Sequence, residues 1–406
     1  MKINSGFFRM IKAVFTVFVI FSFHSILPAQ NIEPVLTEYN MITPGAARYD
    51  KYVPQTENKK TALLVNHASL ADGKHIVDVL LAKGVNVVKI FSPEHGFRGG
   101  KDAGEQFEED KDPSSGLPVI SLYGKHKKPT TEELKDVDVL IIDLQDVGVR
   151  FYTYISTMSL AMEACAENNV KVIVTDRPNP NAFYIDGPVL KKAYSSFVGM
   201  HPVPVVYGMT IGEYAEMVNG EGWLKNGEKC DLTVVPMKGY RRNMIVKLQK
   251  APSPNLPDWR SVYLYPSLCF FEGTVVSVGR GTQYPFMVYG HPRLPFADFS
   301  FLPQSIPGKS KYPKLEGEVC YGQYLAGYAE NYARNPVGIN LSWLISSYKY
   351  LSPGMKFFNN YFDKLAGTDE LRKQITEGKS EQEIRESWKP ALDDFLKIRR
   401  KYLIYK

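Results

Sequence analysis

Runs of apolar residues alternate with segments of helical pattern along the first 245 residues. The runs are short and rich in β-branched and aliphatic side chains, which is typical of buried strands. The predicted strands are TALLVNH (61–67), VNVVKIF (85–91), PVISLYG (118–124), VDVLIIDLQD (137–146) and VKVIVTDRP (170–178), and PVPVVYG (202–208) and LTVVPM (232–237) close the series. Helices are predicted over 72–83, from 129–131 onward, over 152–168 and over 210–219. This alternation indicates an α/β fold with a doubly wound, mostly parallel sheet, in which the nearly continuous apolar run at 137–146 is central.

The texture of the sequence changes near residue 245. Proline becomes frequent, as in APSPNLPDW and YGHPRLPF, and aromatic residues crowd into SVYLYPSLCFFEGT. From Met355 onward the pattern returns to helix. We therefore predict an α/β domain over 31–245 and a smaller α+β domain over 246–406, packed against the first.

The first 30 residues have the pattern of a secretory signal peptide. A basic start with Lys2, Arg9 and Lys12 precedes the apolar run AVFTVFVIFSF, and small residues lie near a cleavage point at Ala29 or Gln30. A signal anchor is the alternative, but the run is short. The sequence therefore predicts an exported protein, periplasmic or extracellular, with no stable membrane span after cleavage.

Composition excludes some classes of function. The apolar fraction of 44% and the charged fraction of 23% are ordinary for a globular protein. The net charge of +6 is small for 406 residues and is dispersed, so nucleic acid is not an expected partner. The four cysteines (Cys165, Cys230, Cys269 and Cys320) lack CxxC spacing, and no pattern supports a disulfide between any two of them.

Polar residues gather where the predicted strands end. In open parallel sheets, ligands bind outside the carboxyl ends of the strands. A helix cap explains one or two such residues, but it does not explain a whole edge of them. We therefore expect a functional site among the strand-end residues Asn66, His67, Glu94, His95, Asp143, Gln145, Asp146, Asp176, Arg177 and Asn179.

Neither a nucleotide cofactor nor a metal fits this pattern. The first strand-to-helix turn, NHASLADGK, has no GxGxxG and no GxxxxGK[ST], and FRGGKDAGE leads into an acidic loop that would repel a pyrophosphate. No HxH or HExxH spacing places two metal ligands on one face. The sequence predicts an enzyme that needs no cofactor and no metal.

Carboxylate chemistry is the remaining possibility. Glycosidic bonds usually break between two carboxyl groups, through an oxocarbenium-like state. Glu94, which is flanked by an aromatic residue and follows a proline, is the candidate general acid. The second group is Asp143, Asp146 or Glu272 in FFEGT, while Tyr152 and the neighbouring Tyr154 are candidates to orient the acid, stack on a sugar or act as nucleophile.

Several motifs resemble the DUF1343 family, whose characterised members are exo-β-N-acetylmuramidases of the NamZ type, glycoside hydrolase family 171. The matching stretches lie between about residues 60 and 290 and are FSPEHGFRG, DLQDVGVRFYTYISTM, DRPNP with DGPVL, YGMTIGE, PSPNLP and YPSLCFFEGTVVSVGRGT. The resemblance implies a Rossmann-like domain, an auxiliary C-terminal domain and an active site in the cleft between them. It also implies release of terminal N-acetylmuramic acid from peptidoglycan fragments, with Glu94 as acid/base and Tyr152, Asp143 or Glu272 as its partner. One position departs from the family pattern: this chain has Tyr207 in YGMTIGE, where many relatives carry Arg-His before Gly-Met.

Arginines near the strand ends suit such a substrate, because muramic acid carries a lactyl carboxylate that a guanidinium binds through paired hydrogen bonds. The candidates are Arg98, Arg150, Arg177 and Arg280. Alternatively, they pair with the aspartates of the site and stiffen it. Two other functions remain open: a non-catalytic protein that binds cell-wall glycans in the same cleft, and a phosphate-ester hydrolase, which would need a metal.

Overall fold

The computed structural model describes residues 35–37, 39–98, 110–295, 298–333 and 336–406. The predicted signal peptide over 1–30 lies outside these ranges, as does most of the FRGGKDAGE loop. Pro34–Lys406 forms one compact unit. The division into domains at 245/246 stays a prediction.

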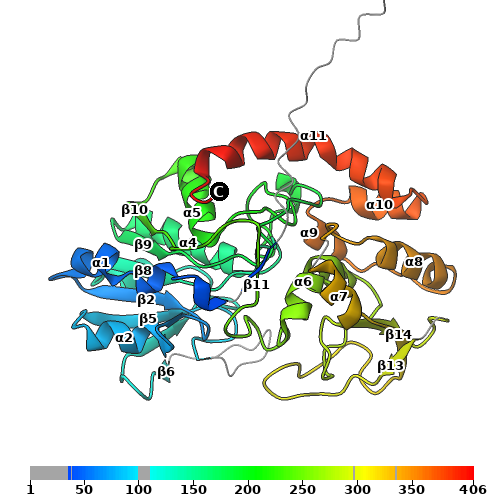
Figure 1. Cartoon of the computed structure of the whole chain (residues 1–406), viewed down its shortest axis with the longest axis horizontal. Helices are drawn as coiled ribbons and strands as arrows, with labels where there is room; N and C mark the ends of the chain where they lie inside the picture. Colours follow the sequence, from blue (N-terminus) through cyan, green and yellow to red (C-terminus); the bar gives the residue numbers. More distant parts are fainter. Residues whose placement is uncertain (1–34, 38, 99–109, 296–297, 334–335) are drawn as a thin grey trace, which may run out of the picture. The chain divides into compact units, whose positions relative to one another are not determined.

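A seven-stranded sheet organises the first half of the chain (Figure 1). Its order is β10-β9-β8-β2-β5-β7-β6, and all neighbours are parallel except the short edge strand β6. The chain runs outward from β2 through β5 to β7, and then crosses to the other side of β2 for β8, β9 and β10. This is the Rossmann strand order, so the predicted doubly wound sheet is confirmed. The strands are β2 (Thr61–Val65), β5 (Val87–Ser92), β6 (Asp110–Lys111), β7 (Pro118–Ser121), β8 (Val139–Asp143), β9 (Lys171–Thr175) and β10 (Leu232–Val235).

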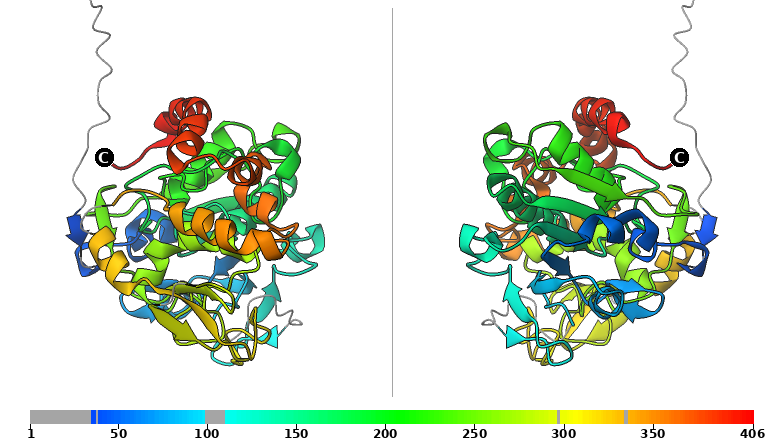
Figure 2. Two further views of the ribbon diagram at one scale, coloured as in Figure 1. Left: turned by 90° about the vertical axis from the view of Figure 1, so that its right-hand side faces the viewer. Right: turned by 90° about the vertical axis from the view of Figure 1, so that its left-hand side faces the viewer.

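Side chains along a strand alternate between the two faces of the sheet, and both faces are buried in apolar clusters. Leu63 packs into a core with α1 (Tyr49–Tyr52) and α2 (Ile76–Ala82). Leu64, the next residue, packs into the core on the opposite face. The helices there are α3 (Thr131–Leu134), α4 (Tyr154–Glu167) and α5 (Ile211–Gly220). Figure 2 shows the ribbon of the chain from two further sides.

The predicted helix over 72–83 begins late, at Ile76. A small hairpin replaces its first turn: β3 (Leu70–Ala71) pairs with β4 (Lys74–His75). Asp72 and Gly73 form its two-residue turn, with φ of 51° and 77°. An Asp-Gly pair is favoured where both central residues need positive φ, so this local turn signal prevails over the helical pattern.

The second half combines a small antiparallel sheet with helices, which confirms the predicted α+β region. The sheet order is β12-β14-β13. Its strands are β12 (Val288–His291), β13 (Phe299–Phe301) and β14 (Cys320–Tyr324). The helices are α6 (Trp259–Leu268), α7 (Ala326–Tyr332), α8 (Ser342–Leu351), α9 (Phe362–Ala366), α10 (Glu370–Thr376) and α11 (Glu381–Arg399). In Figure 1, α11 is the long red helix that returns from α10 toward α5.

One continuous apolar cluster joins the two halves. It extends from the α4 face of the sheet through α6 to α8, α9 and α11. A parallel pair, β1 (Val35–Thr37) with β11 (Met244–Val246), also brings early and later parts of the chain together. In the ranges that the structure describes, no helix combines the length and apolarity needed to cross a bilayer.

An ion pair fills the point where Rossmann sheets bind their ligands, between the carboxyl ends of the strand β2 and the strand β8. The Arg177 guanidinium donates to both carboxylate oxygens of Asp143, at 2.7 and 2.6 Å, and to the carbonyl oxygen of Leu70 at 2.8 Å. Both side chains are buried, with exposed fractions of 2% and 0%. The switch point is therefore occupied by the protein itself.

Breaking this pair from one side leaves a buried charge without its counter-ion. We expect Arg177→Met to lower the free energy of unfolding by about 3–5 kcal/mol, and the double variant Arg177→Met/Asp143→Leu to recover much of the loss. Lys191→Met is the control, since the Lys191–Glu370 pair is 51% and 59% exposed and should contribute at most about 1 kcal/mol. Urea denaturation measures all three. Equal losses for Arg177→Met and Lys191→Met would contradict this account.

Candidate active site

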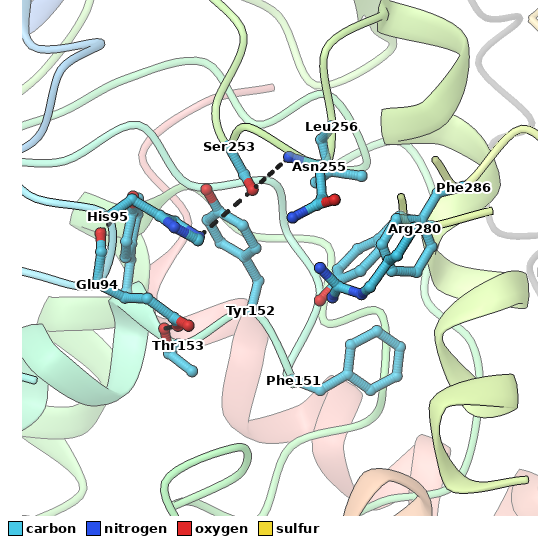
Figure 3. Close-up of a pocket in the computed structure, with 12 residues that line it drawn as sticks. Glu94, His95, Phe151, Tyr152, Thr153, Ser253, Asn255, Leu256, Arg280 and Phe286 are labelled. Carbon is cyan, nitrogen blue, oxygen red and sulfur yellow. Dashed lines mark hydrogen bonds between the residues drawn. The ribbon is translucent and has the colours of Figure 1, made fainter. Parts of the chain in front are cut away.

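A polar pocket of about 60 Å³ lies at the carboxyl end of β5 (Figure 3). Its walls come from both halves of the chain: residues 94–95 and 151–154 face residues 253–256, 265, 280 and 286. Five of the residues expected from the sequence line it, namely Glu94, His95, Tyr152, Tyr154 and Arg280. The structure adds Phe151, Thr153, Ser253, Asn255, Leu256, Tyr265 and Phe286.

Glu94 projects from a sharp turn directly after β5. His95 and Gly96 follow it with φ of 75° and 73°, a left-handed conformation that is uncommon for histidine. Thr153 Oγ1 donates to Glu94 Oε2 at 3.0 Å, and the Tyr154 hydroxyl donates to the Glu94 carbonyl oxygen at 3.3 Å. The carboxyl group is thus oriented, while the residue as a whole stays half-buried.

Tyr123 is a further neighbour of Glu94 that sequence reasoning missed. It follows β7, the strand beside β5. Burial, together with the negative charge of the hydrogen-bonded Glu94, raises the pKa of Tyr123. The phenol therefore stays protonated at neutral pH and remains a hydrogen-bond donor. The only signal in the sequence is the position of this tyrosine at the end of the segment PVISLYG.

Tyr152 closes one side of the pocket as a neutral phenol. Its hydroxyl donates to the carbonyl oxygen of Pro252 at 2.7 Å, and its ring packs edge-on against Tyr154 and Tyr265. Burial raises the pKa of Tyr152 well above its usual value. A phenolate is accordingly disfavoured here, which weakens the case for Tyr152 as a nucleophile.

The PSPNLP loop supplies polar groups opposite Glu94. Ser253 Oγ lies 3.4 Å from His95 Nε2, within hydrogen-bond distance, and accepts from the Asn255 backbone amide at 3.2 Å. The Asn255 side chain donates to the carbonyl oxygen of Lys309 at 2.7 Å. In the sequence, PSPNLP stands out only as a motif of the family. That motif is the signal that could have identified both residues.

Arg280 forms the cationic wall of the pocket. Its Nε donates to both carboxylate oxygens of Glu272 at 3.2 Å, and the guanidinium lies 4.9 Å from the ring centre of Phe286. Within the described ranges, its two terminal nitrogens donate to no other residue. Glu272, in the 3₁₀ helix η6 (Cys269–Gly273), is 24% exposed and stands behind Arg280.

Lys314 fixes the backbone around Glu272. Its ammonium donates to the carbonyl oxygens of Phe271 at 2.8 Å and of Thr274 at 2.6 Å, and reaches those of Glu272 and Val276 at 3.4 and 3.1 Å. These bonds satisfy carbonyl groups at the end of η6 that lack helical partners. The position of the Glu272–Arg280 pair is thus set by a third basic residue.

The other three predicted arginines do not reach this pocket. Arg177 is paired with Asp143 in the sheet. Arg98 pairs with Asp112 at 2.8 Å and with Asp78 at 3.3 Å. Arg150 is fully buried and donates to four backbone carbonyl oxygens, those of Pro188, Val203, Leu365 and Ala366, at 2.7 to 2.9 Å. A substrate carboxylate in the pocket would meet only Arg280 among the four.

The remaining strand-end residues hold the backbone in place. Gln145 donates to the carbonyl oxygens of Asp146 and Pro178, and Asn179 to that of Met209. Asn66 accepts from Ser69, and His67 lies 2.6 Å from the carbonyl oxygen of Ala251. Asp176 accepts from Thr210, Gly212 and Tyr405. None of these side chains lines the pocket.

Asp146 is buried within the protein and does not line the pocket. It accepts hydrogen bonds from the Gly148 amide at 2.8 Å and from the Tyr207 hydroxyl. Burial raises the pKa of Asp146 to about 6, although both hydrogen bonds act in the opposite direction. Tyr207, where the family pattern has Arg-His, is therefore the partner of a buried carboxyl group rather than a group that touches the substrate.

These features define a Rossmann-type α/β protein with a pocket that combines an oriented carboxyl group, aromatic walls and one arginine, residue types suited to glycoside chemistry. The chain belongs to the family of the exo-beta-N-acetylmuramidase NamZ. The N-terminal model of that family matches residues 61–260 and the C-terminal model matches residues 263–405.

Individual relatives agree with this assignment. The peptidoglycan beta-N-acetylmuramidase NamZ of Bacillus subtilis is 39% identical over 377 residues, which are 87% of this chain and 89% of the relative. Two crystal structures of DUF1343 family proteins from Bacteroides fragilis each cover 90% of this chain and 99% of their own. They are 45% and 31% identical to it, with TM-scores of 0.82 and 0.74.

The buried Asp146 should make stability depend on pH. Its folded-state pKa exceeds the usual value of about 3.9, so the folded protein binds more protons, and stability falls as pH rises between about 4 and 6. Asn cannot ionise. Between about pH 4 and pH 7, the free energy of unfolding of Asp146→Asn should therefore gain up to about 3 kcal/mol relative to wild type.

Urea denaturation at several pH values measures this difference. Asp393→Asn, at an exposed position in α11, gives the baseline. A stability difference between Asp146→Asn and wild type that does not change with pH would refute the linkage.

Proposed function

We propose that this protein is an exo-acting glycoside hydrolase that releases terminal N-acetylmuramic acid from peptidoglycan fragments. Membership of the NamZ family supports the substrate class. The observation that carries the proposal for this chain is the pocket itself, where the carboxyl group of Glu94 and the guanidinium of Arg280 line opposite walls. One wall supplies a proton donor and the other binds an anionic sugar.

Glu94 acts as general acid and then as general base. As the glycosidic bond breaks, its carboxyl proton passes to the leaving oxygen, and positive charge develops at the anomeric carbon. Thr153 and Tyr123 hold the resulting carboxylate by hydrogen bonds. Water then adds its oxygen to the anomeric carbon and gives a proton to the Glu94 carboxylate, which forms the free sugar and restores the acid.

Of the four candidates for the second group, the geometry favours Glu272. Asp146 is buried and accepts from the Gly148 amide and the Tyr207 hydroxyl. Asp143 uses both carboxylate oxygens to bind Arg177, and Tyr152 is a neutral phenol engaged with a backbone carbonyl. The Glu272 carboxylate is partly exposed and contacts a residue of the pocket wall. The Glu272 carboxylate does not itself line the pocket, so it acts through Arg280, whose guanidinium it holds in place.

Arg280 reads the lactyl carboxylate that distinguishes muramic acid from glucosamine. Its Nε is occupied by Glu272, which fixes the plane of the guanidinium. Its two terminal nitrogens offer a pair of parallel N–H donors on the side away from the Glu272 carboxylate. A second carboxylate can accept from both of them. Specificity then follows from one arginine held in place by one glutamate.

The role of Glu94 is tested by Glu94→Gln, which keeps the size of the side chain and one oxygen that can accept from Thr153, but cannot transfer a proton. We expect an unchanged melting temperature and a loss of at least about 10² in kcat on a chromogenic N-acetylmuramide. Glu272→Gln, in the same assay, should also lose activity. A folded Glu94→Gln protein with near-normal turnover would remove Glu94 from the mechanism.

The role of Arg280 is tested by Arg280→Met, with kcat/KM measured on a chromogenic N-acetylmuramide and on its N-acetylglucosaminide. Each charge-assisted hydrogen bond contributes about 1.5–3 kcal/mol, so the preference for the muramide should fall by roughly 10–150-fold per bond lost. Arg98→Met, outside the pocket, should keep the wild-type ratio. An unchanged ratio in Arg280→Met means that the carboxylate is bound elsewhere, and equal cleavage by wild type refutes the muramidase assignment.

A further inference from the structure

Two residues of the pocket, Arg280 and Phe286, belong to one short loop between η6 and β12. The Phe286 amide donates to the Val278 carbonyl oxygen at 2.8 Å, and this bond closes the loop. Inside the loop, Thr282 Oγ1 donates to the Gly279 carbonyl oxygen at 2.7 Å. Because these bonds tie the loop together, Arg280 and Phe286 keep fixed positions relative to each other.

The backbone of Phe286 is strained. Its φ is 55°, in the left-handed region, where a bulky side chain crowds the backbone and is rarely found. The loop enters this region at two other positions, Gly279 and Gly281, where no side chain causes strain. A strained residue persists only where its surroundings hold it in place, and such residues cluster at functional sites. Since a glycine would adopt this backbone without strain, the presence of phenylalanine points to a role for its ring.

The ring of Phe286 is a fixed surface beneath the guanidinium of Arg280. Phe286 is 1% exposed, and its ring meets the Tyr265 ring edge-on, with 5.0 Å between the ring centres. The guanidinium carbon lies over the ring of Phe286, 4.9 Å from its centre (Figure 3). A cation within about 6 Å of a ring centre is attracted by the negative face of the ring.

Glu272 and Phe286 hold this guanidinium from two directions. Glu272 accepts from Nε, in the plane of the group, whereas the ring contacts its face. The first contact sets the direction of the plane, and the second prevents the plane from tilting. A carboxylate accepts from two guanidinium nitrogens at once only when it lies in the same plane. The tilt therefore decides whether Arg280 can form two bonds to a substrate carboxylate or one.

We propose that Phe286 is a positioning residue for Arg280. Its ring holds the guanidinium plane at the tilt in which both terminal nitrogens meet the lactyl carboxylate of muramic acid. The inference rests on the proposed function, and it adds the residue through which Arg280 gains its preference for that carboxylate. A role in packing the pocket or in stacking on a sugar would instead affect every substrate alike.

Substitution of Phe286 by leucine removes the aromatic face but keeps a buried apolar side chain. For Phe286→Leu we expect kcat/KM on the chromogenic N-acetylmuramide to fall roughly 3–30-fold, mainly through KM, the range expected for loss of a cation–π contact. On the N-acetylglucosaminide, which has no carboxylate, kcat/KM should stay within about twofold. Phe395→Leu is the control for loss of a core ring, since Phe395 is 2% exposed and lies in α11, and it should match wild type on both substrates.

Fluorinated phenylalanines at position 286 test the same contact with almost no change in shape, so they decide the question if Phe286→Leu does not fold. Fluorine withdraws electron density from the ring and weakens its attraction for a cation. The preference for the muramide should fall stepwise with one, two and three fluorine atoms on the ring. In the Arg280→Met background, Phe286→Leu should change the preference no further, because the ring acts through the arginine.

The outcomes separate this proposal from the proposed function. An equal loss on both substrates, or no loss on either, overturns the positioning role. A preference that fluorination leaves unchanged, but that Arg280→Met abolishes, means that Arg280 binds the carboxylate without help from Phe286. All of these results leave the enzyme a muramidase. Equal cleavage of both sugars by wild type overturns the proposed function and the positioning role with it.

Discussion

The buried guanidinium of Arg150 is the interaction on which the geometry of the site depends. It carries positive charge into a place without solvent, and its partners are four backbone carbonyl oxygens. Two belong to Pro188 and Val203, and two belong to residues at the end of α9. Desolvation lowers the pKa of Arg150 to about 9, because burial disfavours the charged form. The next four residues line the pocket, so one side chain fixes that turn relative to α9 and to the neighbouring Tyr361.

A second constraint explains why the site departs from the usual position in a Rossmann sheet. Ligands of such sheets bind where the strand order reverses, here between β2 and β8. The Asp143–Arg177 pair fills that position and satisfies its own hydrogen bonds. The open polar groups lie instead at the tip of β5, next to the aromatic wall from the second half of the chain. The candidate active site therefore lies one strand away from the usual binding position of this fold.

Period and turn chemistry made most of the fold predictable. Apolar runs gave each strand of the main sheet from β2 to β10 except the short edge strand β6, because a strand buried on both faces must be apolar throughout. The strand predicted over 202–208 is wrong, since that segment forms only isolated bridges at Val206. The late start of α2 follows from the turn at Asp72-Gly73. This turn signal is visible in the sequence, but the predicted helix over 72–83 included it. Of the predicted site, Glu94 and His95 could be located because a strand tip at a sheet edge is a local feature. Ser253 and Asn255 could be found only through the family motif PSPNLP, since their place opposite Glu94 depends on packing across about 160 residues of chain.

The sequence by itself determined the doubly wound α/β class of the fold, the edge of the sheet where polar groups gather and the family to which the chain belongs. All three are encoded in residues close to one another in the chain. Only the tertiary structure decided which arginine is available to a substrate. Arg98, Arg150, Arg177 and Arg280 look equivalent in the sequence, yet three are engaged by aspartates or backbone carbonyls. Whether a charge is free for a ligand depends on which groups surround it, and residues distant in the chain supply those groups.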